Sequence, residues 1–269
     1  MEKIIIHPSF SNLSWLHEGI FLSVADILSF SEGTCYKQNR YRSVRRFEKD
    51  GNFYFLKQFH HVPLSKQIRN ILFSRHSEAF LEWNHLDLVK NLNIPTLDPV
   101  AWGEDFRWRL EKGGFLITKE SPATIRVESF LKSLSPAQNK WREKIVDTIA
   151  DYTRCLHENS YFHKDLYLGH FLIDPRSEDD FDIYLIDLQR LQKHRILAEH
   201  YRIKDLASLY FSVPENSLSR TFQLRFLKKY LKVKRLTKQH KKWITRILKK
   251  SGKIARHTIK LLRKRNTSP

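Results

Sequence analysis

Residues 161–190, which read YFHKDLYLGHFLIDPRSEDDFDIYLIDLQR, decide the fold that we expect for this chain. The triplet His-Lys-Asp occupies positions 163–165, and an apolar segment from His170 to Ile173 follows it. After an acidic polar loop, a second apolar segment from Ile183 to Ile186 leads directly into Asp187. Asp165 and Asp187 thus stand beside two apolar segments, which is how a phosphotransferase places a proton acceptor beside a metal-binding carboxylate.

Strand signals lie upstream of this stretch. Two runs with aromatic and basic residues, one through Phe47 and one from Phe53 to Phe59, flank Asp50-Gly51. Asp-Gly favours positive φ at both central positions of a tight turn, so this pattern predicts a β-hairpin. Lys57 shares a face of the second strand with aromatic residues, where a lysine is costly unless an anionic group meets it.

The remaining elements follow from apolar spacing. We expect residues 8–30 to form a lead-in helix or a helix plus a strand, and residues 77–91 to form a helix that carries Glu78 and Glu82 one turn apart. Short strands are predicted at 100–102, 106–110 and 115–118, and further helices at 141–157, 201–211 and 222–231.

A strand lysine, a helix glutamate, an HxD triplet and a strand that ends in aspartate occur here in the order of a protein-kinase-like site. Phosphoryl transfer needs a cation on the nucleotide phosphates, a metal ion, and a carboxylate that orients the attacking hydroxyl. Lys57 fits the first role, with a helix glutamate as its partner, Asp187 fits the metal ligand, and Asp165 fits the base. Each residue alone has an ordinary surface explanation, and the sequence separates Glu78 from Glu82 only weakly.

Two features depart from the kinase pattern. No GxGxxG segment precedes Lys57, and an arginine-rich run stands there instead. Its side chains, Arg42 among them, either clamp phosphate or form a basic surface hairpin, and the sequence supports both equally. The position five residues after Asp165 is His170 where kinases carry asparagine. Magnesium prefers oxygen ligands, so an imidazole there is a poor match and by itself would favour an inactive kinase fold.

Several segments together resemble a known family, the lipopolysaccharide core sugar kinases of the Kdo/WaaP type, and are closest to the heptose kinases. The resemblance covers most of residues 35–232. It is carried by FYFLKQF (53–59), Glu82-Trp83, Ile94-Pro95-Thr96, FLITK (115–119), HKDLYLGHFL (163–172), IDLQR (186–190), KDLASLYFS (204–212) and Arg225-Phe226-Leu227. Both departures look like habits of that family.

The resemblance implies a fold, a reaction and a set of roles. The fold is α+β and bilobal, with a β-rich N-lobe with one main helix at 1–120 and a mostly helical C-lobe at 121–269. The reaction is transfer of phosphate from ATP, aided by Mg²⁺, to a heptose or Kdo sugar of the lipopolysaccharide inner core. Asp165 is then the base. Lys57, with Glu82 as its partner, and Arg42 form the nucleotide-binding group. Asp187 and His170 hold the metal, and His163 and Asp205 support the site.

The positive charge is concentrated at the C-terminal end. Residues 216–269 hold 19 of the 48 Lys and Arg residues and no Asp or Glu, so they account for the whole formal charge of +19. Within about 232–269, apolar residues from Ile244 to Leu262 form a stripe opposite these charges. That stripe either lies on an anionic membrane or packs on the C-lobe, and the sequence leaves both open.

The charge and composition also limit which classes of partner we expect. An anionic inner-membrane surface and an acidic protein partner fit the basic segment, whereas nucleic acid is disfavoured because few aromatics accompany the charges. The two cysteines have no CxxC spacing, and no apolar run could span a bilayer. We therefore expect a cytoplasmic protein, peripheral at the inner face of the inner membrane of a Gram-negative cell. The alternatives are a kinase-fold phosphotransferase for another small molecule or protein, and an inactive kinase-like binding protein.

Overall fold

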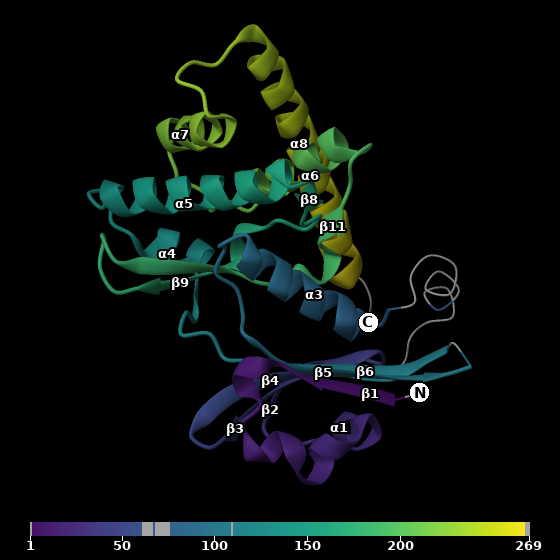
Figure 1. Cartoon of the computed structure of the whole chain (residues 1–269). Helices are drawn as coiled ribbons and strands as arrows, with labels where there is room; N and C mark the ends of the chain where they lie inside the picture. The colour runs from purple at the N-terminus through teal and green to yellow at the C-terminus, as the bar shows by residue number, and fades with distance from the viewer. Residues whose placement is uncertain (1, 61–66, 68–75, 109, 267–269) are drawn as a thin grey trace. The chain divides into compact units, whose positions relative to one another are not determined.

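The computed structural model describes residues 2–60, 67, 76–108 and 110–266 (Figure 1). The chain divides into two compact units, Met1–Asn91 with Thr96–Pro122, and Leu92–Pro95 with Ala123–Pro269. Each unit has its own secondary structure and its own core.

The first unit is built on a six-stranded antiparallel sheet. Its spatial order is β1 (Glu2–Ile6), β5 (Pro99–Arg107), β6 (Leu110–Lys119), β4 (Asn52–Phe59), β3 (Arg42–Lys49) and β2 (Thr34–Gln38). The hairpin predicted at Asp50-Gly51 joins β3 to β4, and both turn residues have positive φ, 50° and 69°. This is the backbone that a two-residue hairpin turn requires.

Side chains of β4 alternate between the two faces of the sheet. Tyr54, Leu56 and Gln58 are buried, and Gln58 donates hydrogen bonds to the carbonyls of Ile27 and Phe30 at 2.8 and 2.9 Å. Those carbonyls belong to α1 (Val24–Ser29) and the residue that follows it, so α1 covers this face. Lys57 points to the other face, where helix α3 (Glu78–Asn91) lies.

The lead-in segment differs from its expected form. Residues 8–30 contain three short 3₁₀ turns, η1 (Pro8–Phe10), η2 (Ser14–His17) and η3 (Gly19–Leu22), before the six-residue α1. The strand β1 comes before them, at Glu2–Ile6. The turns place Trp15 against Phe47 and Tyr54, and Phe21 against Phe47, with ring centroids 5.0 to 6.2 Å apart. Packing of large aromatic rings therefore overrides helical continuity here.

The short strands predicted from 100 to 118 merge into two long ones, β5 and β6. Gly113-Gly114, which lies between two of the predicted strands, is inside β6. A Cβ on Gly114 would lie 2.7 Å from the carbonyl oxygen of Gly103 on the neighbouring strand. The glycines thus allow a close backbone approach inside the sheet and do not end the strand.

The second unit is mostly helical. Its helices are α4 (Val127–Ser133), α5 (Asn139–Glu158), α6 (Ala198–Phe211), α7 (Arg220–Leu231) and α8 (Lys238–Asn266). One small sheet has the order β10 (Phe181–Leu185), β9 (Phe171–Pro175), β7 (Ile125–Arg126), and another pairs β11 (Gln192–Lys193) with β8 (Tyr161–Phe162). Among the described residues, no helix is both long enough and apolar enough to cross a membrane.

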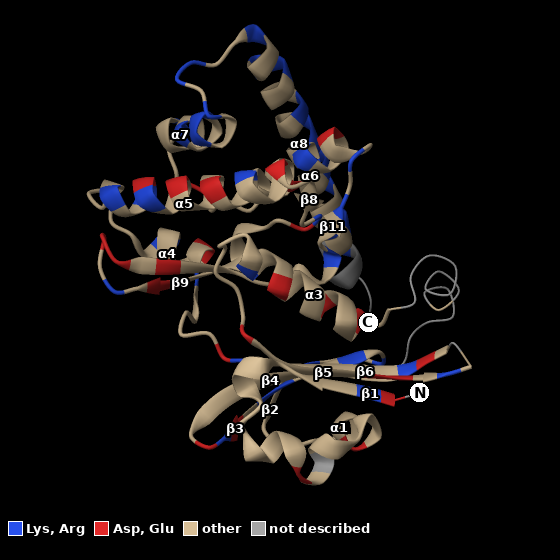
Figure 2. Cartoon of the chain, viewed as in Figure 1, with Lys and Arg blue, Asp and Glu red and all other residues tan. Residues whose placement is uncertain are grey.

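Charges follow the helices of this unit unevenly, as Figure 2 shows. Helix α5 carries both acidic and basic residues, whereas α7 and α8 carry Lys and Arg, drawn in blue, and no Asp or Glu. Arg225 on α7 donates to Asp147 on α5 at 2.8 Å, and Lys229 on α7 lies 3.2 Å from Asp151. Exposed pairs of this kind contribute about 0–1 kcal/mol each, so the helices are held mainly by their apolar faces.

Candidate active site

In the first unit, Lys57 on the central strand β4 forms an ion pair with Glu82 on α3. Only 14% of the lysine side chain and 3% of the glutamate side chain are exposed. The second carboxylate oxygen of Glu82 has no hydrogen-bond partner among the described residues. Of the two glutamates that the sequence left open, Glu82 is the one that meets the ammonium group of Lys57.

The arginine-rich hairpin of the first unit has fewer available cations than its sequence suggests. Arg45 donates to the carbonyl of Ser31 at 2.7 Å, and Arg46 forms a bidentate pair with Glu120 at 2.7 and 2.8 Å. Arg42 is half-buried on β3. Two of the predicted phosphate-clamping side chains are therefore engaged within the protein.

In the second unit, Asp165 follows β8 and faces two cations. Its Oδ2 accepts a hydrogen bond from Arg190 Nη1 at 2.5 Å, and its Oδ1 lies 3.7 Å from Lys204 Nζ. The preceding residue, Lys164, has φ +68°, a left-handed conformation that is uncommon outside glycine. The backbone thus turns sharply just before Asp165.

His170 and Asp187 form the second part of this group. His170 Nδ1 lies 2.8 Å from the carbonyl oxygen of Asp165, and a carbonyl only accepts, so the Nδ1 proton is donated there. In the neutral ring, Nε2 then presents a lone pair, and it lies 3.6 Å from Asp187 Oδ2. A cation between these two atoms would meet one imidazole nitrogen and one carboxylate oxygen.

The donor set limits which cation that would be. Within the described part of the chain, no three His, Cys, Asp or Glu side chains come together as a metal cluster. Magnesium is commonly bound through one or two carboxylates, with phosphate oxygens and water completing the shell. Asp187 is therefore the kind of ligand that magnesium uses together with nucleotide phosphates, and His170 adds a nitrogen ligand that magnesium favours less.

A buried carboxylate on α6 supports the backbone of the HxD triplet. Asp205 is fully buried, and its Oδ2 accepts the backbone N–H of His163 at 2.8 Å. The same oxygen lies 3.4 Å from His157 Nε2, and His157 Nδ1 lies 2.8 Å from the hydroxyl of Tyr230. These contacts form a chain in which Tyr230 donates to His157 and His157 donates to Asp205.

Burial sets the protonation of the two histidines in this region. It lowers the pKa of His157, although Asp205 opposes part of that shift, and it lowers the pKa of His163. Both rings are therefore neutral near pH 7. His163 Nε2 lies 3.2 Å from the Ile186 carbonyl, the residue before Asp187, so the triplet is tied to the second apolar segment as well.

Several residues around the site were not assigned roles from the sequence. Arg190 and Lys204 touch Asp165, while His157 and Tyr230 touch Asp205 directly or through one another. Arg190 ends the IDLQR segment and Lys204 immediately precedes Asp205, so their positions next to predicted site residues were the available signal.

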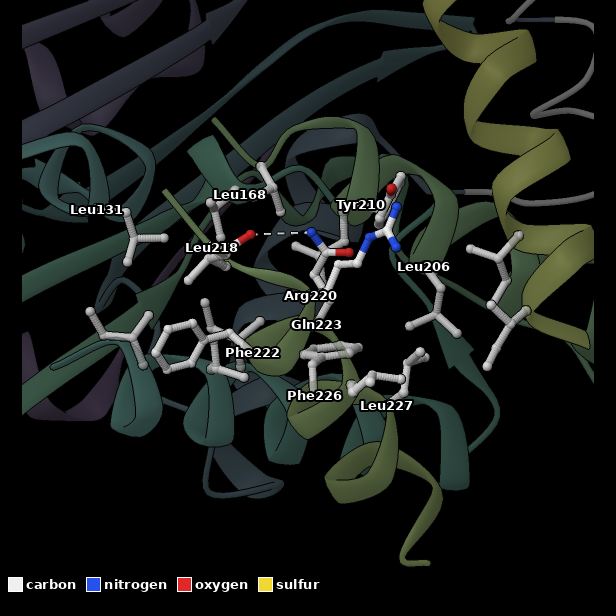
Figure 3. A pocket seen from close by; sticks show the side chains of 18 of the residues that line it. Leu131, Leu168, Leu206, Tyr210, Leu218, Arg220, Phe222, Gln223, Phe226 and Leu227 are labelled. Carbon is white, nitrogen blue, oxygen red and sulfur yellow. Dashed lines mark hydrogen bonds between the residues drawn. The ribbon is translucent and has the colours of Figure 1, made fainter. Parts of the chain in front are cut away.

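An apolar pocket of about 390 Å³ lies among the helices of the second unit (Figure 3). Leucine, isoleucine and valine side chains line most of it, together with Phe222 and Phe226 of α7. Arg220 and Gln223 add polar groups, and Gln223 donates to the Leu218 carbonyl at 3.2 Å. Its volume lies in the range of small-molecule sites, about 300–1,000 Å³.

Known proteins match this chain over most of its length. Residues 29–230 match the model of the lipopolysaccharide kinase (Kdo/WaaP) family. The lipopolysaccharide core heptose(I) kinase WaaP of Escherichia coli is 30% identical over 238 residues, 85% of this chain and 90% of the relative. The enzyme of the same name from Pseudomonas aeruginosa is 30% identical over 208 residues, 75% of this chain and 78% of the relative.

A solved structure agrees with the fold. The structure described as WaaP in complex with acyl carrier protein has a TM-score of 0.72 and 26% identity, and the match covers 93% of this chain and 98% of that one. The predicted α+β kinase-like fold is thereby confirmed. The chain is an enzyme of the kinase class and belongs to the lipopolysaccharide kinase (Kdo/WaaP) family.

Proposed function

We propose that this chain transfers the γ-phosphoryl group of ATP to a heptose hydroxyl of the lipopolysaccharide inner core. Heptose is favoured over Kdo because the curated relatives at 30% identity are heptose(I) kinases. The observation that carries the proposal is the buried Lys57–Glu82 pair. A lysine held extended by a helix glutamate is the element that kinase-like sites use on nucleotide phosphates.

The proposed roles follow from the contacts of each side chain. Lys57 binds the α- and β-phosphates, and Arg42 on the neighbouring strand adds positive charge. Asp165 orients the sugar hydroxyl and accepts its proton. Asp187 and His170 would hold Mg²⁺ with the phosphates, and the metal would supply charge neutralisation there.

Two residues keep the base in position. Asp205 accepts the His163 N–H at 2.8 Å, and the hydrogen bond from His170 to the Asp165 carbonyl is also 2.8 Å. The loop is thus fixed on both sides of Asp165, so the base has little freedom to move. Holding a catalytic group in its reactive geometry lowers the barrier because less motion is lost when the reaction takes place.

The reaction is tested with radiolabelled ATP and core oligosaccharide from cells that lack this protein. We expect label on the oligosaccharide with the wild-type chain and at least a hundredfold less with Asp165→Asn, because a general base contributes about 10²–10⁴-fold. Mass spectrometry of the product identifies the sugar. Label on Kdo, or no label on any core sugar while another acceptor is phosphorylated, would contradict the heptose proposal.

We also propose an acidic protein partner, an acyl carrier protein, for the second unit. The solved relative is described in complex with such a protein. Here the apolar pocket next to basic α7 offers a place for an acyl chain, and Lys228 is among the exposed charges of that helix. An acidic carrier would meet opposite charge outside the pocket and apolar surface within it.

Binding of purified carrier protein tests this partner. We expect acylated carrier to bind more tightly than the unacylated form, and Lys228→Glu to weaken both. Lys37→Glu, an equal charge change on exposed β2 of the first unit, serves as the control. Equal affinity of acylated and unacylated carrier would remove the pocket from the proposal.

The last turns of α8 support a peripheral location at an anionic membrane. The first part of this helix packs on the core through Trp243, Ile247 and Ile254. Further along, Ile259 and Leu261 are 51% and 48% exposed beside basic residues. Each Lys or Arg near an anionic bilayer contributes on the order of 1 kcal/mol to binding.

The membrane proposal is tested by truncation after residue 254, which keeps the packed part of α8. We expect lost binding to vesicles with anionic lipid and unchanged binding to ATP. If the truncated chain still binds those vesicles, the last turns are not the membrane contact.

A further inference from the structure

The cations around Asp165 carry an inference about the acceptor, which rests on the proposed function. A carboxylate that accepts the proton of a sugar hydroxyl needs at least one oxygen free to contact it. In this structure Oδ2 of Asp165 is bonded to Arg190 at 2.5 Å, and Oδ1 lies 3.7 Å from Lys204. The guanidinium group thus competes with the sugar hydroxyl for Oδ2.

Arg190 is placed to exchange partners at low cost. Its side chain is 60% exposed, whereas that of Asp165 is 26% exposed. Among the residues that the structure describes, Asp165 is its only side-chain partner. An exposed ion pair is worth about 0–1 kcal/mol, so a second anion of similar geometry can replace Asp165 with little loss.

The guanidinium group also determines which anion that is. Arginine has five N–H donors in a planar fork, and one of them contacts Asp165 here. The fork matches carboxylate and phosphate groups, which accept two parallel hydrogen bonds. A neutral sugar has no group of that kind, so it leaves Arg190 on Asp165.

We propose that Arg190 is the specificity-determining residue of the acceptor site. It binds a carboxylate or phosphate that the acceptor carries close to the reacting hydroxyl, and in doing so it leaves Asp165 Oδ2 for that hydroxyl. Recognition of the anion and release of the base are then one event. Lys204, on the other oxygen, keeps the carboxylate paired when Arg190 has left.

The local sequence agrees with an anionic acceptor. Residues 188–198 contain Arg190, Lys193 and Arg195 and no acidic residue. Arg190 lies in η5 (Leu188–Arg190), directly after Asp187. One short turn therefore carries both the proposed metal ligand and the proposed acceptor ligand, and fixes the spacing between them.

The test measures steady-state kinetics with three forms of core oligosaccharide: native, with carboxyl groups reduced to hydroxymethyl, and with phosphates removed. For the wild-type chain we expect kcat/KM to fall roughly 10- to 100-fold on whichever form lacks the recognised anion, the effect of one lost charge-assisted contact. The form that suffers the fall identifies the anion as carboxylate or phosphate.

Arg190→Gln should raise KM for the native acceptor by a similar factor, leave KM for ATP at its wild-type value, and abolish the discrimination between the three forms. Arg190→Lys should recover only part of the effect, because lysine keeps the charge without the fork. Arg235→Gln removes an equal charge from an exposed position of the same unit, between α7 and α8, and serves as the control.

Other outcomes overturn the proposal. A raised KM for ATP would assign Arg190 to the phosphate donor, and wild-type discrimination retained in Arg190→Gln would exclude it from acceptor recognition. Calorimetric binding of the three oligosaccharides separates this from the proposed reaction. Binding that depends on Arg190 without phosphate transfer would overturn the reaction alone, and transfer without that dependence would overturn this inference alone.

Discussion

The Lys57–Glu82 pair makes a prediction about stability that depends on how unequally its two members are buried. Lys57→Met leaves Glu82, 3% exposed, without its counter-charge. Glu82→Gln leaves Lys57, 14% exposed, whose long stem can carry the ammonium group toward water. The two single substitutions should therefore differ, although each breaks the same contact.

The magnitudes follow from the cost of an unpaired buried charge. Lys57→Met removes one partner of a buried pair and leaves Glu82 unpaired, so we expect it to cost about 3–5 kcal/mol. For Glu82→Gln we expect about 1–2 kcal/mol, the cost of a weakened hydrogen bond to a group that can still reach solvent. The double variant should resemble Glu82→Gln alone, because no buried charge remains uncompensated.

Urea unfolding followed by tryptophan fluorescence measures the free energy of unfolding of the four proteins. Lys90→Met is a matched control in the same unit, because Lys90 pairs with Asp98 at an exposed position, where such a pair is worth about 0–1 kcal/mol. Equal costs for the two single substitutions, or a larger cost for Glu82→Gln, would refute the reasoning from burial.

Three further predictions concern two residues that support the HxD loop and one strained glycine. Burial lowers the pKa of His157, so below about pH 6.5 the unfolded chain binds more protons than the folded chain. The free energy of unfolding should therefore fall by up to about 1.4 kcal/mol for each pH unit below that value. His157→Gln should flatten this dependence in unfolding curves measured from pH 7.5 to 5.5. Asp205→Asn removes the charge that accepts the His163 N–H, so phosphate transfer should slow at least tenfold while the affinity for ATP, measured by calorimetry, stays the same; a loss confined to ATP affinity would contradict this. Gly33→Ala should unfold at a distinctly lower temperature than Gly252→Ala. Gly33 has φ +79°, and a Cβ there would lie 2.1 Å from the Arg46 carbonyl oxygen, whereas Gly252 lies in α8 beside open space, where alanine should stabilise the protein by up to about 1 kcal/mol. Calorimetry that ranks the two melting temperatures the other way would contradict this.

Local patterns predicted the parts of the fold that local physics controls. The Asp50-Gly51 hairpin depends on two adjacent residues that tolerate positive φ, and the helices at 78–91 and 139–158 depend on spacing within a few turns. The pairing of β1 with β5 joins residues about a hundred positions apart, and nothing in either segment specifies its partner. The three 3₁₀ turns were missed for the same reason, because they are stabilised by aromatic packing from distant strands.

In the candidate site too, some contacts could be predicted from local sequence, whereas others depend on distant segments. Lys57 and Glu82 could be predicted because the sheet and the helix that carry them were predictable, and their side chains meet as expected. The engagement of Arg46 by Glu120, 74 residues away, was not predictable from an arginine-rich run alone. The contact of Arg190 with Asp165 likewise depends on how the chain returns after Asp187. Roles in the reaction stay predictions for all of these residues.

The hydrogen-bond chain from Tyr230 through His157 and Asp205 to His163 has a consequence for protein engineering. The HxD loop takes its shape from side chains on α5, α6 and α7, and Tyr230 is in turn stacked on Trp243 of α8, with ring centroids 6.1 Å apart. Transferring residues 163–172 alone into another helical scaffold would therefore carry the sequence of the motif without its conformation. To keep that conformation, the four helices α5, α6, α7 and α8 would have to be transferred with the loop.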